Sequence, residues 1–416
     1  MNSNRQVVIT GMGVVCPIGI GVQEYWQSLV DGRSGVRVRE EYRDTELPLR
    51  IYAPINDFEG KKFVKPRKAM KVMCLPIQFG FAAAAMAVEQ AGLGEGVCDP
   101  DRYGTVFGSE TFFADPMEVA SVFRKCVTEQ HYDHDRWGEF AMREIQPLWM
   151  LKYLPNMVTA HISIANDARG PCNSICQGEV SGLLALVEGA TLIRRGVCDV
   201  VVVGGTGSQT SISSVLYRGQ DEMSRRIHEP EKASRPFDRD RDGLVLGEGA
   251  GAIVLESEAF AQKRNANIIS RVLGWSREYA SPKSDKFSDA IESNLRSTLE
   301  DSQLSPEKVG HLNAHGTGMV EPDMFEALAI GRVFKETPVV TQKANFGLLG
   351  PGGPIIELIA SLQANVAGQL PTNINTENPD PRCPLNLNDR SSLNLSPTIK
   401  TSISATGQIV SLAISR

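Results

Sequence analysis

Short apolar runs rich in β-branched residues alternate with amphipathic stretches along this chain, and this alternation restricts the fold more than any other feature. Residues 199–203 and 252–255 are such runs, and glycine bounds them, as is typical of buried strands. Between 179 and 195, apolar residues recur at helical spacing, and Gly196 follows in the position of a helix C-cap. Residues 288–299 repeat the helical spacing. Strands that alternate with helices predict a parallel sheet covered on both faces, and hence the α/β class.

Composition limits the number of domains and the classes of partner. With 416 residues, the chain can bury a large core and is long enough for two domains or one duplicated domain. Hydrophobic residues at 42% and charged residues at 22% argue against disorder. A net charge of -6 provides no basic footprint for nucleic acid or for an anionic membrane. No apolar run could span a bilayer, and the N-terminus leads directly into a strand, so we expect a cytoplasmic protein without a signal peptide.

The eight cysteines are scattered through apolar or loop contexts, and only Cys172 and Cys176 lie close together in the sequence. No second pair of cysteines and no histidine cluster completes a zinc site. We therefore expect reduced thiols, most of them structural, and neither a bound metal nor a cofactor.

A set of motifs, most of which contain glycine, extends over nearly the whole chain. The motifs are an opening strand and turn (8–19), the approach to a loop that opens a helix (155–164) and that loop itself (170–182). A long segment that contains arginine and glycine (235–251) and two polar loops (313–318 and 343–348) complete the set. Together these motifs resemble the β-ketoacyl-[acyl-carrier-protein] synthases, the condensing enzymes of fatty-acid and polyketide assembly. No large gap interrupts the resemblance.

The resemblance implies a thiolase-like fold of two similar βαβαβ halves, packed as a five-layered α/β/α/β/α sandwich. We expect an N-terminal half over residues 1–256, with the helix-opening loop, and a C-terminal half over residues 257–416, with the histidine and lysine loops. The segment 113–151 is richer in charged and aromatic residues. Within the resemblance, it is interpreted as an insertion that caps the pocket and reaches toward a dimer partner.

The resemblance also assigns the catalytic positions of the family. Glu179 stands where the family has its nucleophilic cysteine, and Leu348 stands where it has its second histidine. His315 matches the first catalytic histidine, and Lys343 matches the lysine that lies near the two histidines. No other histidine of the chain falls within the Lys343 loop, so the second histidine has not moved along the sequence.

Condensation needs a thiol that is activated by the N-terminus of the helix it opens. Glu179 cannot replace this thiol, because acyl transfer to a carboxylate would give a mixed anhydride that lies uphill from a thioester. A carboxylate at a helix start does suit the helix dipole, which contributes about 0.3–1 kcal/mol. We therefore interpret Glu179 as a helix-start residue paired with Lys343. Asp323 and Glu326 are expected to hold the lysine in a structural network.

Two further loops depart from the family pattern. Met319 and Pro322 stand where a threonine and a glycine are expected, and Pro322 fixes φ and removes a backbone donor. Residues 404–407 replace a turn in which a phenylalanine acts as a gate, and Ala405 is too small for that role. The motifs at 235–251 remain, so the sequence indicates that the fold is kept while the reaction is not.

Three functions fit these changes. The favoured one is a non-condensing subunit similar to the chain-length factors of type II polyketide systems, which pairs with an active ketosynthase and shapes the acyl pocket. The second is a malonyl-carrier decarboxylase, or another non-standard acyl-carrier enzyme, that uses His315 and Lys343. In the third, Cys176 acts as a substitute nucleophile, although it lies three residues before the usual position.

Whether the chain is an enzyme stays open at this stage. The expected partners are acyl-carrier protein, whose phosphopantetheine carries the substrate, and a competent ketosynthase in a heterodimer. A homodimer is the alternative assembly.

Overall fold

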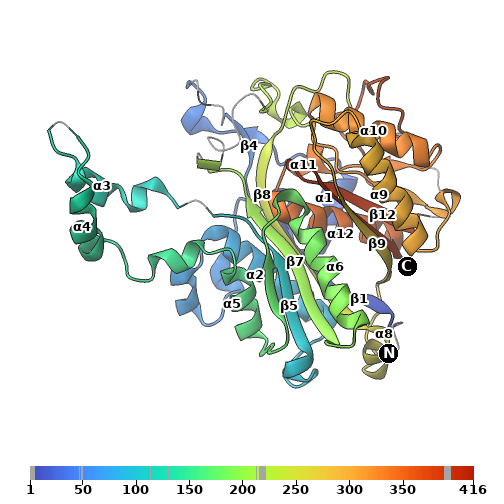
Figure 1. The fold of residues 1–416 in the computed structure, drawn as a ribbon, viewed down its shortest axis with the longest axis horizontal. Coiled ribbons are helices and arrows are strands. Elements are labelled where there is room, and N and C mark those ends of the chain that lie inside the picture. Colours follow the sequence, from blue (N-terminus) through green and yellow to red (C-terminus); the bar gives the residue numbers. More distant parts are fainter. Residues whose placement is uncertain are drawn as a thin grey trace.

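The computed structural model describes residues 5–45, 47, 50–112, 114–129, 131–211, 213–214, 222–387 and 395–416. Phe113, the expected start of the insertion, lies outside the described residues. The described strands form one mixed sheet in the order β11-β10-β12-β13-β9-β1-β8-β7-β5-β6, with β2, β3 and β4 attached beside this path. Figure 1 shows helices on both sides of the strands and one arm that projects from the body.

The strands are β1 (Val7–Cys16), β2 (Gly19–Ile20), β3 (Arg37–Val38), β4 (Ile51–Ala53), β5 (Tyr103–Gly108), β6 (Cys172–Ile175), β7 (Val200–Ser208), β8 (Leu246–Ser257), β9 (Ser270–Tyr279), β10 (His311–Asn313), β11 (Val339–Val340), β12 (Thr398–Ile403) and β13 (Gln408–Ser415). The helices are α1 (Val22–Val30), α2 (Leu75–Ala91), α3 (Ala120–Cys126), α4 (Trp137–Glu144), α5 (Met157–Ala165), α6 (Ser181–Arg194), α8 (Glu258–Lys263), α9 (Phe287–Asp301), α10 (Val320–Val333), α11 (Lys343–Phe346) and α12 (Gly353–Ala367).

Successive side chains of a strand point to opposite faces of the sheet, and each face packs against its own layer of helices, which gives five layers in all. In β7, Val200 and Val202 belong to the core that includes α2, whereas Val201 belongs to the core that includes α6 and α12. In β13, Leu412 joins the α6 and α12 core, and Ala413 joins the core formed with α9 and α10. Helices α6 and α12 are therefore enclosed between two halves of the sheet. The expected α/β/α/β/α sandwich is confirmed.

Two glycines of the opening motif allow the outer helix to approach the sheet. A Cβ atom at Gly11 would overlap the carbonyl oxygen of Ala87, and one at Gly13 would overlap that of Ala83. Both carbonyls belong to α2, so any larger residue at these positions would push the helix away from β1. The glycines of the opening strand thus set the spacing of the first two layers.

The predicted elements are present, but the sheet is mixed and not parallel. Residues 200–203 of the first run lie in β7, the run 252–255 lies in β8, and 288–299 lies in α9. Strands β1, β7 and β8 pair antiparallel, as do β12 and β13, whereas β5–β7 and β10–β12 pair parallel. The prediction of a parallel sheet is therefore wrong in part. A turn as short as 404–407 can join only antiparallel strands, and alternation of elements does not reveal such hairpins.

The projecting arm is formed by α3 and α4 (Figure 1). Its base is closed by Glu118, whose carboxylate accepts hydrogen bonds from Trp149 Nε1 (2.6 Å), Lys152 Nζ (2.6 Å) and Tyr153 Oη (2.8 Å). The division at 256/257 stays a prediction, and it falls at the end of β8. Among the described helices, none is both long and apolar enough to cross a membrane.

His311 makes the stability of the C-terminal layer sensitive to acid. Its Nδ1 donates to the carbonyl oxygen of Leu395 at 2.6 Å, so its Nε2 accepts from Ser361 Oγ at 3.0 Å, and the buried ring is neutral. Burial lowers the pKa of His311 from 6.5 to about 4. The unfolded chain therefore binds more protons in this window, and stability falls as the pH drops from about 6.5 toward 4.

We predict that this histidine accounts for about 3 kcal/mol of the stability lost over that window, since one pKa unit corresponds to about 1.4 kcal/mol. Urea unfolding of the native chain and of His311→Gln at several pH values measures the difference. An equal slope of unfolding free energy against pH in both proteins would contradict the prediction.

Candidate functional site

Three of the four residues that the sequence analysis assigned to catalytic positions line one cavity. Glu179, His315 and Leu348 surround a space of about 350 Å³, together with Ser404 and Ala405 of the β12–β13 turn. They come from the start of α6, from the loop after β10 and from the segment after α11. Lys343 is buried behind His315.

Glu179 lies in a short 3-10 helix (Gly178–Val180) that leads into α6, and it is only 4% exposed. Its Oε2 accepts a hydrogen bond from the backbone N–H of Ala405 at 3.3 Å, and its carbonyl oxygen accepts from Ser402 Oγ at 3.4 Å. The carboxylate is therefore held against the β12–β13 turn. Its place at the start of α6 also suits the positive end of the helix dipole.

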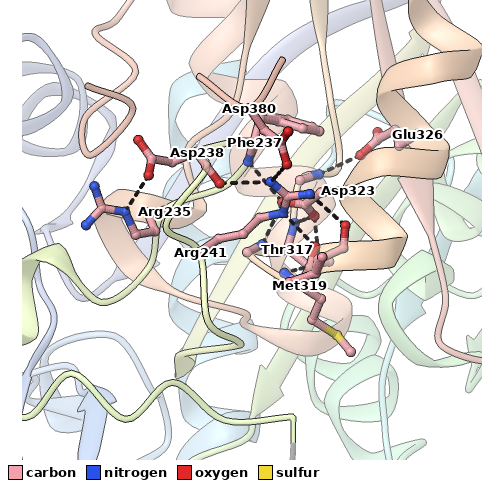
Figure 2. Close-up of polar contacts among 12 residues, drawn as sticks. Arg235, Phe237, Asp238, Arg241, Thr317, Met319, Asp323, Glu326 and Asp380 are labelled. Carbon is pink, nitrogen blue, oxygen red and sulfur yellow. Dashed lines mark hydrogen bonds and ion pairs between the residues drawn. The ribbon is translucent and has the colours of Figure 1, made fainter. Parts of the chain in front are cut away.

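The loop that carries His315 is fixed by two carboxylates of α10. Glu326 accepts from the backbone N–H groups of His315 (2.6 Å) and Gly316 (2.8 Å), and Asp323 accepts from those of Thr317 (2.7 Å) and Gly318 (3.0 Å). Figure 2 shows both carboxylates pointing at the loop. Burial raises the pKa of Glu326 to about 7, against the opposing effect of these N–H donors. The two acids thus hold the backbone of the loop.

The expectation that Asp323 and Glu326 hold Lys343 is therefore wrong. Lys343 Nζ donates to Glu357 Oε1 at 2.6 Å and to the carbonyl oxygen of His315 at 2.5 Å, and it lies 3.3 Å from His315 Nδ1. The ion pair of Lys343 is thus made with Glu357 and replaces the expected pairing with Glu179. The acids of α10 are occupied by backbone donors, which sequence spacing alone could not show.

Glu357 is shared by two buried lysines. Lys400 Nζ lies 2.6 Å from Glu357 Oε2 and donates to the carbonyl oxygen of Ala314 at 3.1 Å. Burial alone would raise the pKa of Glu357, but Lys343 and Lys400 hold it below its ordinary value. Burial lowers the pKa of Lys400 to about 8, with Glu357 opposing the shift.

Sequence reasoning missed both Glu357 and Lys400. A signal was present in each case, because Glu357 is the one charged residue of helix α12 and Lys400 is the one charged residue of β12, and most residues of both elements are buried. A lone charge in a buried element must find a buried partner.

One wall of the cavity is apolar because Leu348 lines it. Its side chain is buried in a small apolar cluster with Met223, Leu244 and Leu246, against which Met319 packs. A leucine side chain offers no hydrogen bond to a ligand. This wall can therefore contribute only apolar contact.

Arg241 ties the start of α10 to the neighbouring loops (Figure 2). Its guanidinium donates to the carbonyl oxygens of Met319 (3.1 Å) and Val320 (2.7 Å), and it pairs with Asp380 at 2.7 Å. Pro322 lies in the first turn of α10, where backbone N–H groups have no partner within the helix. The fold therefore accommodates this proline without loss of an intrahelical hydrogen bond.

Two other expectations concern groups outside the cavity. Cys176 does not line it, and burial and then Glu110 raise the pKa of this thiol, which disfavours a reactive thiolate. None of the described residues of 113–151 lines this cavity, and the role of the segment as a cap that reaches toward a dimer partner stays a prediction. The arm projects away from the body (Figure 1).

Over the described part of the chain, no group of acidic, histidine or cysteine side chains is arranged to hold a metal ion.

We predict that Glu357→Gln will destabilise the protein by about 3–5 kcal/mol, because it leaves two buried ammonium ions without their carboxylate. Lys400→Met should cost far less, since Lys343 and Glu357 remain paired and an apolar side chain fills the space. Chemical unfolding of the two variants measures the contrast. Equal losses in the two variants would show that the shared carboxylate is not the stabilising element.

Comparison with known proteins agrees with this geometry. Residues 4–261 match the family of β-ketoacyl synthase N-terminal domains, and residues 277–377 match that of the C-terminal domains. The chain is 31% identical to 3-oxoacyl-[acyl-carrier-protein] synthase 2 of Coxiella burnetii over 99% of both chains. It is also 31% identical to the enzyme of the same name from Vibrio cholerae, over 91% of this chain and 90% of the relative.

Solved structures show the same fold. A β-ketoacyl synthase from Burkholderia phymatum superimposes with a TM-score of 0.88 at 24% identity and covers 99% of this chain and 100% of its own. The ishigamide ketosynthase/chain length factor superimposes with a TM-score of 0.85 at 26% identity, over 99% of both chains. The fold is therefore the thiolase-like ketosynthase fold, and the chain belongs to the β-ketoacyl synthase family of fatty-acid and polyketide biosynthesis.

Proposed function

We propose that this chain is a non-condensing subunit that pairs with an active ketosynthase and shapes the acyl pocket. The observation that carries the proposal is the cavity itself. A buried carboxylate, Glu179, stands at the position that the resemblance assigns to the nucleophile, and Leu348 stands at the position of the second histidine. The likeness to a ketosynthase/chain length factor at 26% identity supports the same role.

The contacts of Glu179 oppose condensation in two ways. Its carboxylate accepts the N–H of Ala405, a donor that a thioester carbonyl in this cavity would need. Its negative charge also repels a malonyl carboxylate, and the cavity wall screens that repulsion poorly because it is largely apolar. Formation of the acyl intermediate and approach of the extender unit are both hindered.

The projecting arm supports a protein partner. Together with the segments at its base, it exposes several large apolar side chains, at Met117, Phe123, Val127, Met142, Leu148 and Met150. Several exposed apolar side chains on and beside one projecting element favour an interface there. Because Glu118 closes the base of the arm, these side chains are presented on an ordered element.

A basic surface supports acyl-carrier protein as the second partner. Lys65, Arg67, Lys68 and Lys71 are exposed on and beside a 3-10 helix (Arg67–Val72) that precedes α2. Lys62, which is also exposed, pairs with Glu59 at 2.8 Å. Such a cluster in a chain of net charge -6 attracts anionic groups, and the phosphopantetheine arm of a carrier contains a phosphate.

The alternative is a malonyl-carrier decarboxylase that uses His315 and Lys343. The contact between Lys343 Nζ and His315 Nδ1 favours it, because a lysine donor at Nδ1 would leave Nε2–H as a donor toward the cavity. Glu179 weighs against it, since an ionised carboxylate cannot donate a hydrogen bond to an enolate. The association experiment below separates the two functions.

We predict that co-expression with a cysteine-bearing ketosynthase from the same organism gives a one-to-one heterodimer in native mass spectrometry. A self-dimer would contain two copies of the Glu179 site and no thiol at that position. Met142→Asp combined with Met150→Asp should weaken the heterodimer at least about tenfold, because each places a charge in the apolar surface of the arm. Val366→Asp, at an exposed apolar position outside the arm, is the matched control and should have no effect.

A stable homodimer that ignores the ketosynthase and releases carbon dioxide from malonyl-carrier would contradict the proposal and favour the decarboxylase. Equal weakening by Val366→Asp would show that the arm has no special part in association.

We further predict that Glu179→Cys alone does not restore condensation, although the new cysteine should acylate. Leu348 supplies no hydrogen bond to the thioester oxygen, and the loss of one such donor typically costs about 10²–10³ in rate. The altered 404–407 turn and Met319 should reduce the rate further by misplacing the substrate. Elongation assays and intact-mass spectrometry measure the two steps separately.

The double variant Glu179→Cys/Leu348→His should also stay far below an ordinary synthase. Robust elongation by the single variant, without a partner, would show that only the nucleophile is missing and that the rest of the pocket is competent.

A further inference from the structure

One buried residue beside the loop after β10 has a backbone conformation that its own side chain disfavours. Phe237 has a φ of 63° and is fully buried. A left-handed backbone is rare for residues other than glycine, and with a bulky side chain it persists only where the surrounding structure holds it. Strained residues of this kind gather at functional sites. The contacts of Phe237 therefore indicate what its conformation is for.

Two hydrogen bonds hold the backbone of Phe237 in place. Its N–H donates to Asp323 Oδ2 at 3.0 Å, and its carbonyl oxygen accepts from the N–H of Asp380 at 2.9 Å (Figure 2). The angle φ sets the direction of the N–H relative to the side chain and to the carbonyl group. A change to the usual negative range would therefore break one of these hydrogen bonds or move the aromatic ring.

Asp323 links this residue to the loop after β10. The same carboxylate accepts the N–H groups of Thr317 and Gly318, at 2.7 Å and 3.0 Å. The ring of Phe237 provides a second link, since a Cβ atom at Gly316 would lie 2.8 Å from one of its carbon atoms. Gly316 itself has a φ of 46°, which a residue with a Cβ atom would adopt only under strain. Shared hydrogen bonds and close packing thus hold the turn and the loop in one arrangement.

From these contacts we infer that Phe237 is a positioning residue for His315. Its left-handed backbone directs an N–H to Asp323 while its ring supports Gly316, and both contacts fix the loop that carries the histidine. His315 and Thr317 line the cavity, so the conformation of Phe237 sets this wall before any ligand binds. The inference goes beyond the proposed function, because it concerns how the cavity is held and applies whether or not the chain pairs with a ketosynthase.

The first test addresses the strained backbone and uses the full chain. At a position with negative φ, alanine gives a more stable protein than glycine, because glycine loses more backbone freedom on folding. At position 237 we expect the reverse order, with Phe237→Gly unfolding at a higher urea concentration than Phe237→Ala, because only glycine adopts this φ without strain. A more stable alanine variant would overturn the inference.

The second test follows the imidazole signals of His315 by NMR, assigned with the variant His315→Gln. Phe237→Leu keeps a large apolar side chain but removes the ring beside Gly316, so we expect it to shift these signals. Phe79→Leu is the matched control, since Phe79 is equally buried in the separate core that includes α2. It should lower the stability without shifting the signals. Unchanged signals in Phe237→Leu, or an equal shift in both variants, would contradict the positioning role.

Hydrogen exchange of the unmodified chain tests the link without any substitution. The amides of Phe237, Thr317 and Gly318 all donate to Asp323, so we expect them to open together and to show similar protection. If the amide of Phe237 opens independently of the other two, the link through Asp323 is absent and the inference fails. Because heterodimer formation is measured separately, failure here leaves the proposed pairing untouched, and the reverse also holds.

Discussion

Buried charges hold the backbone of the 313–318 loop from both sides, and the geometry of the cavity depends on this. Glu326 accepts the N–H groups of His315 and Gly316, while Lys343 and Lys400 donate to the carbonyl oxygens of His315 and Ala314. Hydrogen bonds to charged groups contribute about 1.5–3 kcal/mol each, more than neutral ones. A loop of this composition would otherwise bury polar backbone groups without partners, which folded chains avoid. His315 is thus placed by electrostatics and not by apolar packing.

The residues that hold this loop are separate from those that differ from the family pattern. The holding groups come from α10, α12, β12 and α11, whereas Glu179 comes from the start of α6 and Leu348 from an apolar cluster. Neither Glu179 nor Leu348 supplies any of the hydrogen bonds to the loop backbone described above. A cysteine and a histidine could therefore be replaced at these two positions while the loop keeps its shape. Under the proposed function, this separation allows the chain to keep the fold of its family while the residues at positions 179 and 348 differ from the family pattern.

The sequence predicted the local elements well and the long-range pairings poorly. Strands β7 and β8 and helices α6 and α9 follow from periodicity, because each pattern is contained within one element. The partner of Lys343 was assigned to the nearest acids of the motif, yet Glu357 of α12 supplies the carboxylate. Which acid reaches a buried lysine depends on helix packing, and spacing in the sequence does not encode it. The arm shows the same limit, since composition marked 113–151 as distinct but did not indicate that it projects from the body.

The position of Glu179 has a consequence that a simple loss of the thiol would not have. The N–H of Ala405 donates to its carboxylate, so a thioester carbonyl must compete with a charged acceptor for this donor. Hydrogen bonds to ionised acceptors are roughly twice as strong as those to neutral ones, so the resident carboxylate has the advantage. An alanine in place of the cysteine would have removed the nucleophile and left the donor available to a carbonyl. Under the proposed function, a glutamate stands in place of the nucleophile and also occupies the donor, which would make the site resistant to acyl thioesters as the partner role requires.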